Sequence, residues 1–240
     1  MKCGAILYVI TAFLCFGCNL NNTGSQDLAL ESIVSDFSHS QDGWEADFSD
    51  YPATAEDSLK LNLQFSYTNL PANLGSGKSI MLSGTNYNDD LFMFIKKKVN
   101  GLRPNTEYTL TFEVEFASNA SSGGTSSNEG SPGESVFLKA GAVAVEPSKI
   151  VRESDYVLNI DKGQLLYGGQ NMIVLGNIAA GQNASNYTLL TRTNANNLVP
   201  FTAITNSAGE LWLIVGTDSG FSGTTTIYYT KVSVVLSATV

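Results

Sequence analysis

Apolar and polar residues alternate along most of the chain after residue 44. The segment 59–67 (LKLNLQFSY) carries leucine, phenylalanine and tyrosine at its odd positions, and the segment 108–116 (YTLTFEVEF) carries large apolar side chains at its even positions. Successive side chains of a β-strand point to opposite faces, so this alternation predicts strands with one buried face. Turn-forming residues separate these and the later runs, and together the runs predict about a dozen short strands.

The same pattern decides the fold class. No segment keeps a helical period over a useful length. A parallel α/β fold needs a helical crossover between its strands, so that class is excluded. Short strands with one apolar face each bury those faces when two antiparallel sheets pack together. The sequence therefore predicts an all-β protein, an antiparallel β-sandwich of jelly-roll type.

Residues 117–135 (ASNASSGGTSSNEGSPGES) interrupt the strands with small polar residues. This segment is either a linker between two domains or a long loop inside one. Apolar strands abut it directly on both sides, whereas a linker usually follows a completed domain with some slack. We therefore expect one domain over residues 31–240 with a long loop at 117–135. Loops beyond about 12–15 residues are usually functional or disordered.

The N-terminus has the layout of an export signal. Lys2 precedes an apolar run at 5–16, which is shorter than the roughly 20 residues that a membrane-spanning helix needs. The run ends in Gly17 and Cys18, and in this it resembles a bacterial lipoprotein signal, in which the cysteine is lipidated and becomes the new N-terminus. The family prefers Leu three positions before the cysteine, where this chain has Cys15. An ordinary cleaved signal and an uncleaved anchor are the alternatives.

The remaining leader features agree with export. All three cysteines, Cys3, Cys15 and Cys18, lie within residues 1–18, so the rest of the chain can form no disulfide. Residues 19–30 are polar and predict a flexible tether. The formal charge of −9 argues against nucleic acid and against electrostatic docking on anionic lipid. We expect an exported protein that its N-terminal lipid anchors to the bacterial cell envelope, at the outer membrane or the cell surface.

Two stretches resemble known β-sandwich families. Residues 101–110 (GLRPNTEYTL) resemble the tyrosine corner of fibronectin type III domains, which implies that the Tyr108 hydroxyl bonds back to the preceding turn. The same pattern and the closing run 209–236 are similar to jelly-roll carbohydrate-binding modules and galactose-binding-like domains. That resemblance implies a sandwich that binds a glycan. The whole chain also resembles uncharacterised secreted bacterial proteins, which imply no function.

Residues 36–57 combine acidic and aromatic side chains. They contain seven acidic residues and no Lys or Arg. An aromatic ring beside carboxylates suits a sugar, because the ring stacks on C–H groups and the carboxylates bind hydroxyls. The candidate ligand-binding residues are Trp44, Asp47, Asp50, Tyr51 and Tyr87. The alternative is that Trp44, Ala46 and Phe48 alternate as a core strand and that Asp47 lies on its solvated face.

Carboxylates also suggest a metal. Calcium takes about 6–8 oxygen ligands, and EF-hand spacing does not occur, so distant segments would have to supply them. Calcium is thus a candidate cofactor, with Asp42, Asp89, Asp90 and Asp218 as candidate ligands. The single histidine, His39, and the lack of cysteine after residue 18 exclude a Cys/His zinc site.

Catalytic chemistry has one candidate pair. Glu113 and Glu115 lie on one strand face with Cα atoms roughly 7 Å apart, whereas retaining glycosidases hold their carboxyl groups about 5–5.5 Å apart. We favour the alternative that the two glutamates belong to a solvated strand face, and no Ser/His/Asp triad can be assembled around His39. The basic run 96–98 predicts an edge strand that charge protects from pairing.

Three functions therefore remain open. The first is a non-catalytic envelope lipoprotein that binds a glycan or a similar polar ligand. The second is a structural or adhesive envelope protein that binds other proteins through sheet edges and polar loops. The third is a polysaccharide-active enzyme that uses Glu113 and Glu115.

Overall fold

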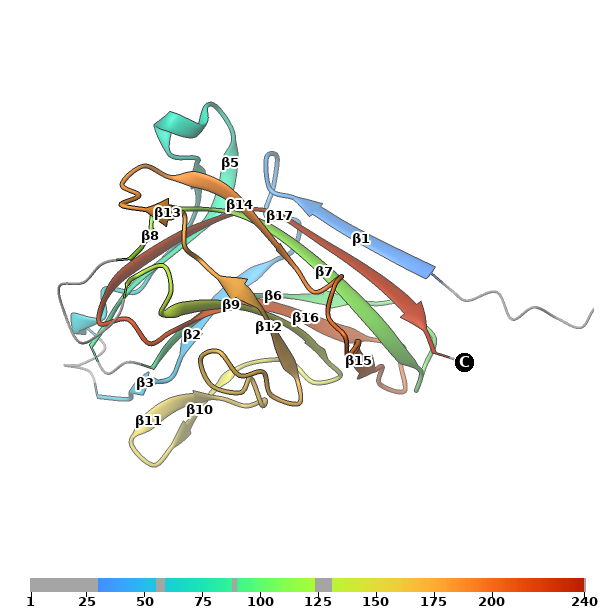
Figure 1. The fold of residues 1–240 in the computed structure, drawn as a ribbon. Helices are drawn as coiled ribbons and strands as arrows, with labels where there is room; N and C mark the ends of the chain where they lie inside the picture. Colours follow the sequence, from blue (N-terminus) through green and yellow to red (C-terminus); the bar gives the residue numbers. More distant parts are fainter. Residues whose placement is uncertain (1–29, 55–58, 88–89, 124–130, 240) are drawn as a thin grey trace, which may run out of the picture.

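Two antiparallel sheets pack face to face and confirm the predicted β-sandwich (Figure 1). The computed structural model describes residues 30–54, 59–87, 90–123 and 131–239. The elements are β1 (Leu30–Asp36), β2 (Glu45–Ser49), β3 (Tyr51–Pro52), β4 (Gln64–Asn69), η1 (Ala72–Leu74), β5 (Lys78–Asn86), β6 (Leu91–Val99), β7 (Glu107–Ser118), β8 (Ser121–Ser122), β9 (Val136–Val143), β10 (Lys149–Arg152), β11 (Asp155–Leu158), β12 (Met172–Asn177), β13 (Gly181–Gln182), β14 (Thr188–Thr193), β15 (Phe201–Ile204), β16 (Leu211–Ser219) and β17 (Gly223–Ala238).

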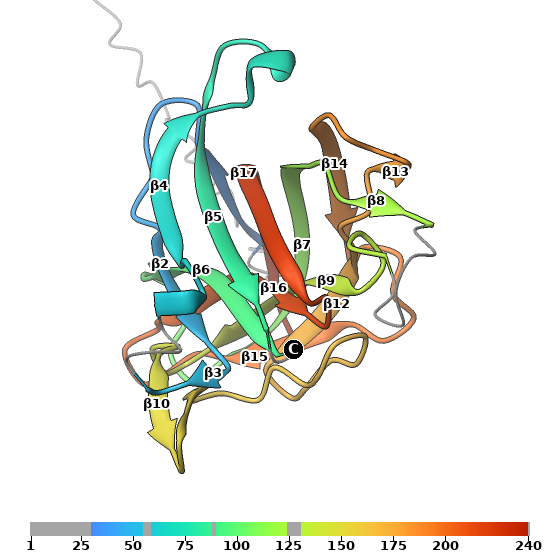
Figure 2. The ribbon, with the colours of Figure 1, turned by 90° about the vertical axis from the view of Figure 1, so that its left-hand side faces the viewer.

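The larger sheet has seven strands and the smaller has five. In the larger sheet the order is β14-β7-β17-β5-β4, with β1 beside β17 and β15 beside β7. In the smaller sheet the order is β12-β9-β16-β6-β2. Strands from before and after residues 117–135 therefore lie side by side in both sheets, as β5 beside β17 and β6 beside β16 show (Figure 2).

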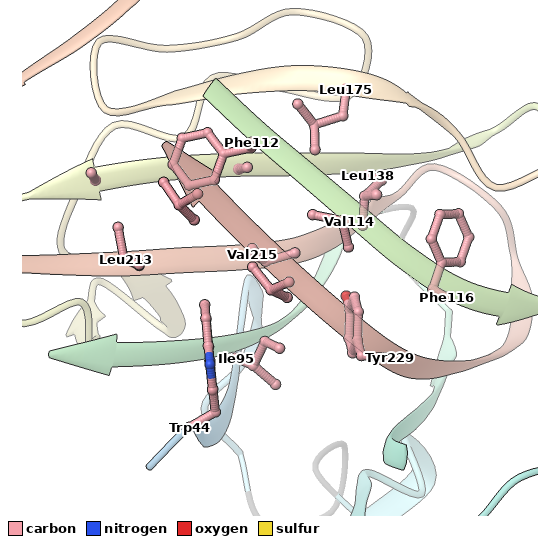
Figure 3. Packing of buried hydrophobic residues seen from close by; sticks show 14 of the residues in the cluster. Trp44, Ile95, Phe112, Val114, Phe116, Leu138, Leu175, Leu213, Val215 and Tyr229 are labelled. Atoms are coloured by element: carbon pink, nitrogen blue, oxygen red, sulfur yellow. The ribbon is translucent and has the colours of Figure 1, made fainter. Parts of the chain in front are cut away.

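The alternation of β7 and β17 builds the main core. In β7 the even-numbered apolar residues from Tyr108 to Phe116 are buried. In β17 the buried residues are first odd-numbered, ending at Tyr229, and then even-numbered from Val232. A register shift between Tyr229 and Lys231 opposite β7 explains this change, because one extra residue reverses the face of every later side chain. Figure 3 shows side chains of both sheets meeting in this core.

The turn before β7 is the predicted tyrosine corner. The backbone N–H of Arg103 donates a hydrogen bond of 3.0 Å to the Tyr108 hydroxyl, and the Tyr108 side chain is buried. The hydroxyl thus returns to the turn five residues upstream, as the resemblance implies.

The outer face of the five-stranded sheet is covered as well. β10, β11 and β3 form a small sheet of their own, and the chain between β11 and β12 returns across β6, β16 and β9 (Figure 1). A second apolar cluster lies beneath this cover and consists of Phe92, Phe94, Leu158, Met172 and Ile214. Burial on both faces explains why β6 begins with an unbroken apolar run, because neither face needs polar residues.

The predicted edge strand at 96–98 is wrong for β6 as a strand, because β6 lies between β16 and β2, and Lys96 pairs with both Ile214 and Glu45. Among the described residues, Lys97 and Lys98 lie past the end of β2 and pair with β16 alone. The lysines are tied to acidic partners instead: Lys96 to Glu146, Lys97 to Asp42 and Lys98 to Glu210.

The predicted leader, including Cys18, and residues 19–29 of the predicted tether lie outside the described residues, whereas Leu30, the last tether residue, begins β1. Within the described ranges, no helix is long and apolar enough to cross a membrane.

Candidate functional site

A polar cleft of about 590 Å³ opens where Asp50 and Asp90, at the ends of two strands, face β11 and the loop that follows it. Its size falls within the roughly 300–1,000 Å³ that small-molecule sites occupy. We call it the polar cleft, and its charged and amide-bearing lining includes Asp50, Asp90, Arg152, Asp161, Lys162 and Gln164. These residues come from four separate segments, so the cleft exists only in the folded chain.

Strand ends place the two main carboxylates. Asp50 joins β2 to β3 and has a left-handed backbone, with φ at 63°. Its N–H donates to the carbonyl of Tyr156, which fixes the turn from the five-stranded sheet into the small sheet. Asp90 stands just before β6, and its N–H donates to Asn86 Oδ1 at 3.3 Å.

A buried ion network forms the floor of the polar cleft. Lys139 Nζ donates to Asp218 Oδ2 at 2.8 Å and to the carbonyls of Lys162 and Tyr167, each at 3.0 Å. These three bonds use all three donors of the ammonium group. Asp218 also accepts from Lys162 Nζ at 3.1 Å and from the N–H of Leu165 at 2.8 Å. The network therefore ties residues 159–171 between β11 and β12, which we call the cover segment, to β9 and β16.

The Lys162 ammonium gathers three carboxylates. Its Nζ lies 3.1 Å from Asp218, 3.3 Å from Asp50 and 3.9 Å from Asp90. Burial alone would lower the pKa of Lys162, but the charges of Asp218, Asp50 and Asp90 outweigh burial and raise it. Lys162 is therefore charged at neutral pH and holds the carboxylates in place.

Burial raises the pKa of the carboxyl groups, whereas it acts to lower the pKa of the lysine. It raises the pKa of Asp90 to about 6, although the nearby Lys162 charge opposes the shift. Burial also raises the pKa of Asp50, again against the attraction of Lys162. Asp90 is the more exposed of the two, with 46% of its side chain accessible, so it faces the cleft opening.

The loop that carries Lys162 is closed on itself. The Asp161 carboxylate accepts from the N–H groups of Gly163 and Gln170, and Asp161 and Asn171 exchange two further bonds. Gly163 has φ of 68°, and a Cβ there would collide with the Tyr167 carbonyl, so the loop requires glycine at this position. The result is a fixed turn whose tip presents Tyr167 with 70% of its surface exposed.

Two predicted ligand-binding aromatics belong to the core, so that expectation is corrected. Trp44 is 3% exposed, packs edge-on against Phe37 and donates from Nε1 to Ser35 Oγ at 2.9 Å. Tyr51 is 4% exposed, and its hydroxyl accepts from Lys149 Nζ. Neither ring face can stack on a ligand. The alternation that begins at Trp44 therefore described a core strand.

The other predicted ligand-binding residues have different environments. Asp50 lines the polar cleft. Asp47 does not line it and instead forms an ion pair of 2.9 Å with Lys149. Tyr87 follows β5 and is largely exposed, three positions before Asp90 in sequence.

The predicted metal ligands bind lysines. Asp42 pairs with Lys97 at 2.7 Å, and Asp89 lies outside the described residues. Asp90 and Asp218 do approach each other, but they do so around the Lys162 ammonium, whose charge takes the place that a cation would fill. Within the described ranges, no three His, Cys, Asp or Glu side chains are arranged to hold a metal ion.

The predicted catalytic pair lies on the larger sheet. Glu113 is exposed, and Glu115 accepts a hydrogen bond of 2.6 Å from the Thr230 hydroxyl. Neither glutamate lines the polar cleft. Their positions agree with a solvated strand face.

Sequence reasoning missed Arg152, Lys162, Lys139 and Tyr167. Lys139 stands inside an otherwise apolar strand, and Asp218 stands near the end of β16 after its apolar run. Two opposite charges in such strands are the signal of a buried ion pair. Tyr167 precedes two glycines, and an aromatic residue in a glycine-rich turn is a signal of exposure. Arg152 carries no comparable signal.

No protein-family model matches the sequence, and no curated protein matches it either. Several solved structures match the chain at low similarity. One is the carbohydrate-binding module TmCBM27, studied for mannan recognition, with 10% identity, a TM-score of 0.39, and coverage of 88% of this chain and 99% of that one. Another is the CBM22-1 xylan-binding domain of Paenibacillus barcinonensis Xyn10C, with 8% identity, a TM-score of 0.38 and coverage of 87% and 95%.

A third is the K1 cleaved adhesin domain of Lys-gingipain from Porphyromonas gingivalis W83. It shows 10% identity and a TM-score of 0.36, and the match covers 85% of this chain and 97% of that one. All three likenesses are weak.

Proposed function

We propose that the protein is a non-catalytic binding module whose polar cleft holds a hydroxyl-rich ligand of the glycan class. The observation that carries the proposal is the set of polar groups that converge on this cleft. Asp50 and Asp90 offer carboxylate oxygens that accept hydrogen bonds from hydroxyl groups, and Arg152 offers up to five donors at the rim. A few convergent polar groups in a concave site are what orient a small polar ligand.

The floor beneath these groups favours binding over chemistry. The Asp50 carboxylate is held 3.3 Å from the Lys162 ammonium, which in turn is held by Asp218. Such fixed groups are already oriented before a ligand arrives, which reduces the entropy that binding must overcome. The exposed Tyr167 ring belongs to the same fixed loop and supplies an aromatic surface next to the cleft-lining Gln164.

The fold also suits a protein that is held by its N-terminal end. Leu30 pairs with Ser237 near the C-terminal end of β17. The other end of β17 begins at Gly223, which pairs with Asn86, and Asn86 Oδ1 accepts from the N–H of the cleft residue Asp90. β1 begins near the C-terminus, and β3 lies at the far side of the sandwich (Figure 1). An envelope lipoprotein anchored through Cys18 would therefore present the polar cleft away from the membrane.

Affinity electrophoresis in gels that contain xylan, mannan or galactan tests the proposal. The purified chain should be retarded by at least one of these polysaccharides, and both Arg152→Ala and Asp90→Ala should reduce the retardation. Glu113→Gln is the matched control, because it removes one charge on the larger sheet and should leave retardation unchanged. Equal retardation of the wild type and both cleft variants, or none in any gel, would refute the proposal.

A further inference from the structure

A second hollow lies at the same end of the sandwich as the polar cleft. It measures about 380 Å³, and we call it the threonine hollow. Its lining includes Asn119, Phe221, Thr224 and Thr226. Thr224 and Thr226 belong to the start of β17, so this hollow opens on the larger sheet.

A fixed turn presents the aromatic residue of this hollow. The Phe221 N–H donates to Ser219 Oγ at 3.3 Å, and that hydroxyl lies 3.3 Å from the Phe221 carbonyl, which accepts from it. Gly223 lies under the ring, because a Cβ there would come within 2.6 Å of the Phe221 ring. Its φ of 155° also disfavours other residues. The turn therefore sets the position of the ring.

One buried side chain connects the threonine hollow to the polar cleft. Asn86 donates from Nδ2 to the Ser219 carbonyl at 2.7 Å, and its Oδ1 accepts from the Asp90 N–H at 3.3 Å. Asn86 is 1% exposed. It thus holds the turn of Phe221 on one side and the cleft carboxylate on the other.

The cleft loop touches the same turn directly. The Leu165 side chain, from the loop that carries Lys162, packs against Gly220. A Cβ added at Gly220 would lie only 3.1 Å from that side chain. The two concave sites therefore lie on either side of the turn 219–223.

The chemistry of the threonine hollow matches that of the polar cleft. Hydroxyl pairs join Thr224 to Thr85 at 2.8 Å and Thr226 to Ser83 at 2.7 Å, and each hydroxyl keeps further hydrogen-bonding capacity. An aromatic ring beside hydroxyl groups suits a ring that has C–H groups on its face and hydroxyls on its edge.

We propose that the threonine hollow is a second subsite for the ligand of the polar cleft. The ligand is then an oligosaccharide chain that passes the turn 219–223, and a single sugar binds in the polar cleft alone. This inference rests on the proposed function of the polar cleft. It adds Phe221, Thr224 and Thr226 as ligand-binding residues, none of which lines the cleft itself.

Calorimetric titration with xylo-, manno- and galacto-oligosaccharides of increasing length tests the inference. Affinity of the full chain should rise with length until the ligand spans both subsites. Phe221→Ala should weaken binding of the longest ligands about tenfold, because it removes a stacking contact, and should leave binding of the monosaccharide unchanged. Arg152→Ala should weaken binding at every length.

Two further variants separate stacking from packing. Phe221→Leu keeps an apolar side chain over Gly223 but has no ring, so it should behave like Phe221→Ala. Thr224→Val removes one exposed hydroxyl at nearly constant volume and should also act on long ligands alone. If affinity is independent of length, or Phe221→Ala weakens every length equally, the subsite is refuted while the cleft function stands. If no oligosaccharide binds at all, both proposals fail.

Discussion

Lys139 and Asp218 form an ion pair with a separation of 2.8 Å, although neither side chain is accessible to solvent. Asp218→Asn would leave Lys139 and Lys162 buried without their main countercharge. Breaking a buried pair on one side typically costs about 3–5 kcal/mol. We therefore expect the free energy of unfolding in urea to fall by about that amount.

Glu210→Gln is the control for this experiment, because Glu210 forms a surface pair with Lys98 at 2.7 Å. Surface pairs contribute at most about 1 kcal/mol. If Asp218→Asn cost no more than Glu210→Gln, the buried network would not hold the cover segment.

Stability should depend on pH through Asp90. Its pKa is about 6 in the folded protein against 3.8 in the unfolded chain. Because the folded protein binds this proton more tightly than the unfolded chain, protonated Asp90 contributes to the free energy of unfolding. That contribution is fully present below pH 3.8 and is lost as the pH rises through about 6. Asp90→Asn should remove most of this loss, and the raised pKa of Asp50 leaves a remainder of the same sign. Urea unfolding of both proteins across this range measures the difference, and parallel curves would contradict it.

Two buried tyrosines should respond oppositely to loss of their hydroxyls. Among the described residues, the Tyr229 hydroxyl has no hydrogen-bond partner, whereas the Tyr108 hydroxyl accepts from Arg103. A buried unpaired polar group costs about 1–3 kcal/mol, so Tyr229→Phe should stabilise the protein. Tyr108→Phe should destabilise it by about 1 kcal/mol, because it removes the hydrogen bond between the Arg103 N–H and the Tyr108 hydroxyl. Thermal melts of the two variants decide this, and shifts of the same sign would count against the assignment.

Gly141 lets the cover segment approach β9. A Cβ at this position would collide with the Asn171 carbonyl, so Gly141→Ala should push the cover outward. Overpacking typically costs about 1–3 kcal/mol. Limited proteolysis should then cut within residues 144–171 faster than in the wild type. Gly77→Ala is the control, because its Cβ would meet only the mobile end of Leu70, and equal cleavage of both variants would contradict the prediction.

The sequence was sufficient to predict the β-sandwich, because each strand carries its own alternation of apolar and polar residues. The even positions of β7 are the buried ones, and the turn before Tyr108 has the residues that a tyrosine corner needs. Trp44 shows how composition misleads. Its acidic neighbours suggested an exposed ring, yet the alternation through Phe48 correctly described a core strand.

The polar cleft could not be predicted because it depends on register and on tertiary cover. Lys139 and Asp218 are 79 positions apart, and they meet because Lys139 pairs with Gly216 across β9 and β16. A shift by one residue would have turned Asp218 to the opposite face. Arg152 reaches the cleft because it belongs to β10, a strand of the small sheet that covers the five-stranded sheet.

The pairing of β1 with β17 also determines how the protein resists a mechanical force applied at its N-terminal end. The chain enters at Leu30, at the opposite end of the sandwich from the polar cleft, and β1 is antiparallel to β17 along seven residue pairs. Tension between a held N-terminus and a ligand in the cleft would run along β1. All of its inter-strand hydrogen bonds would then share the load in shear, whereas a strand pulled sideways would lose them one at a time.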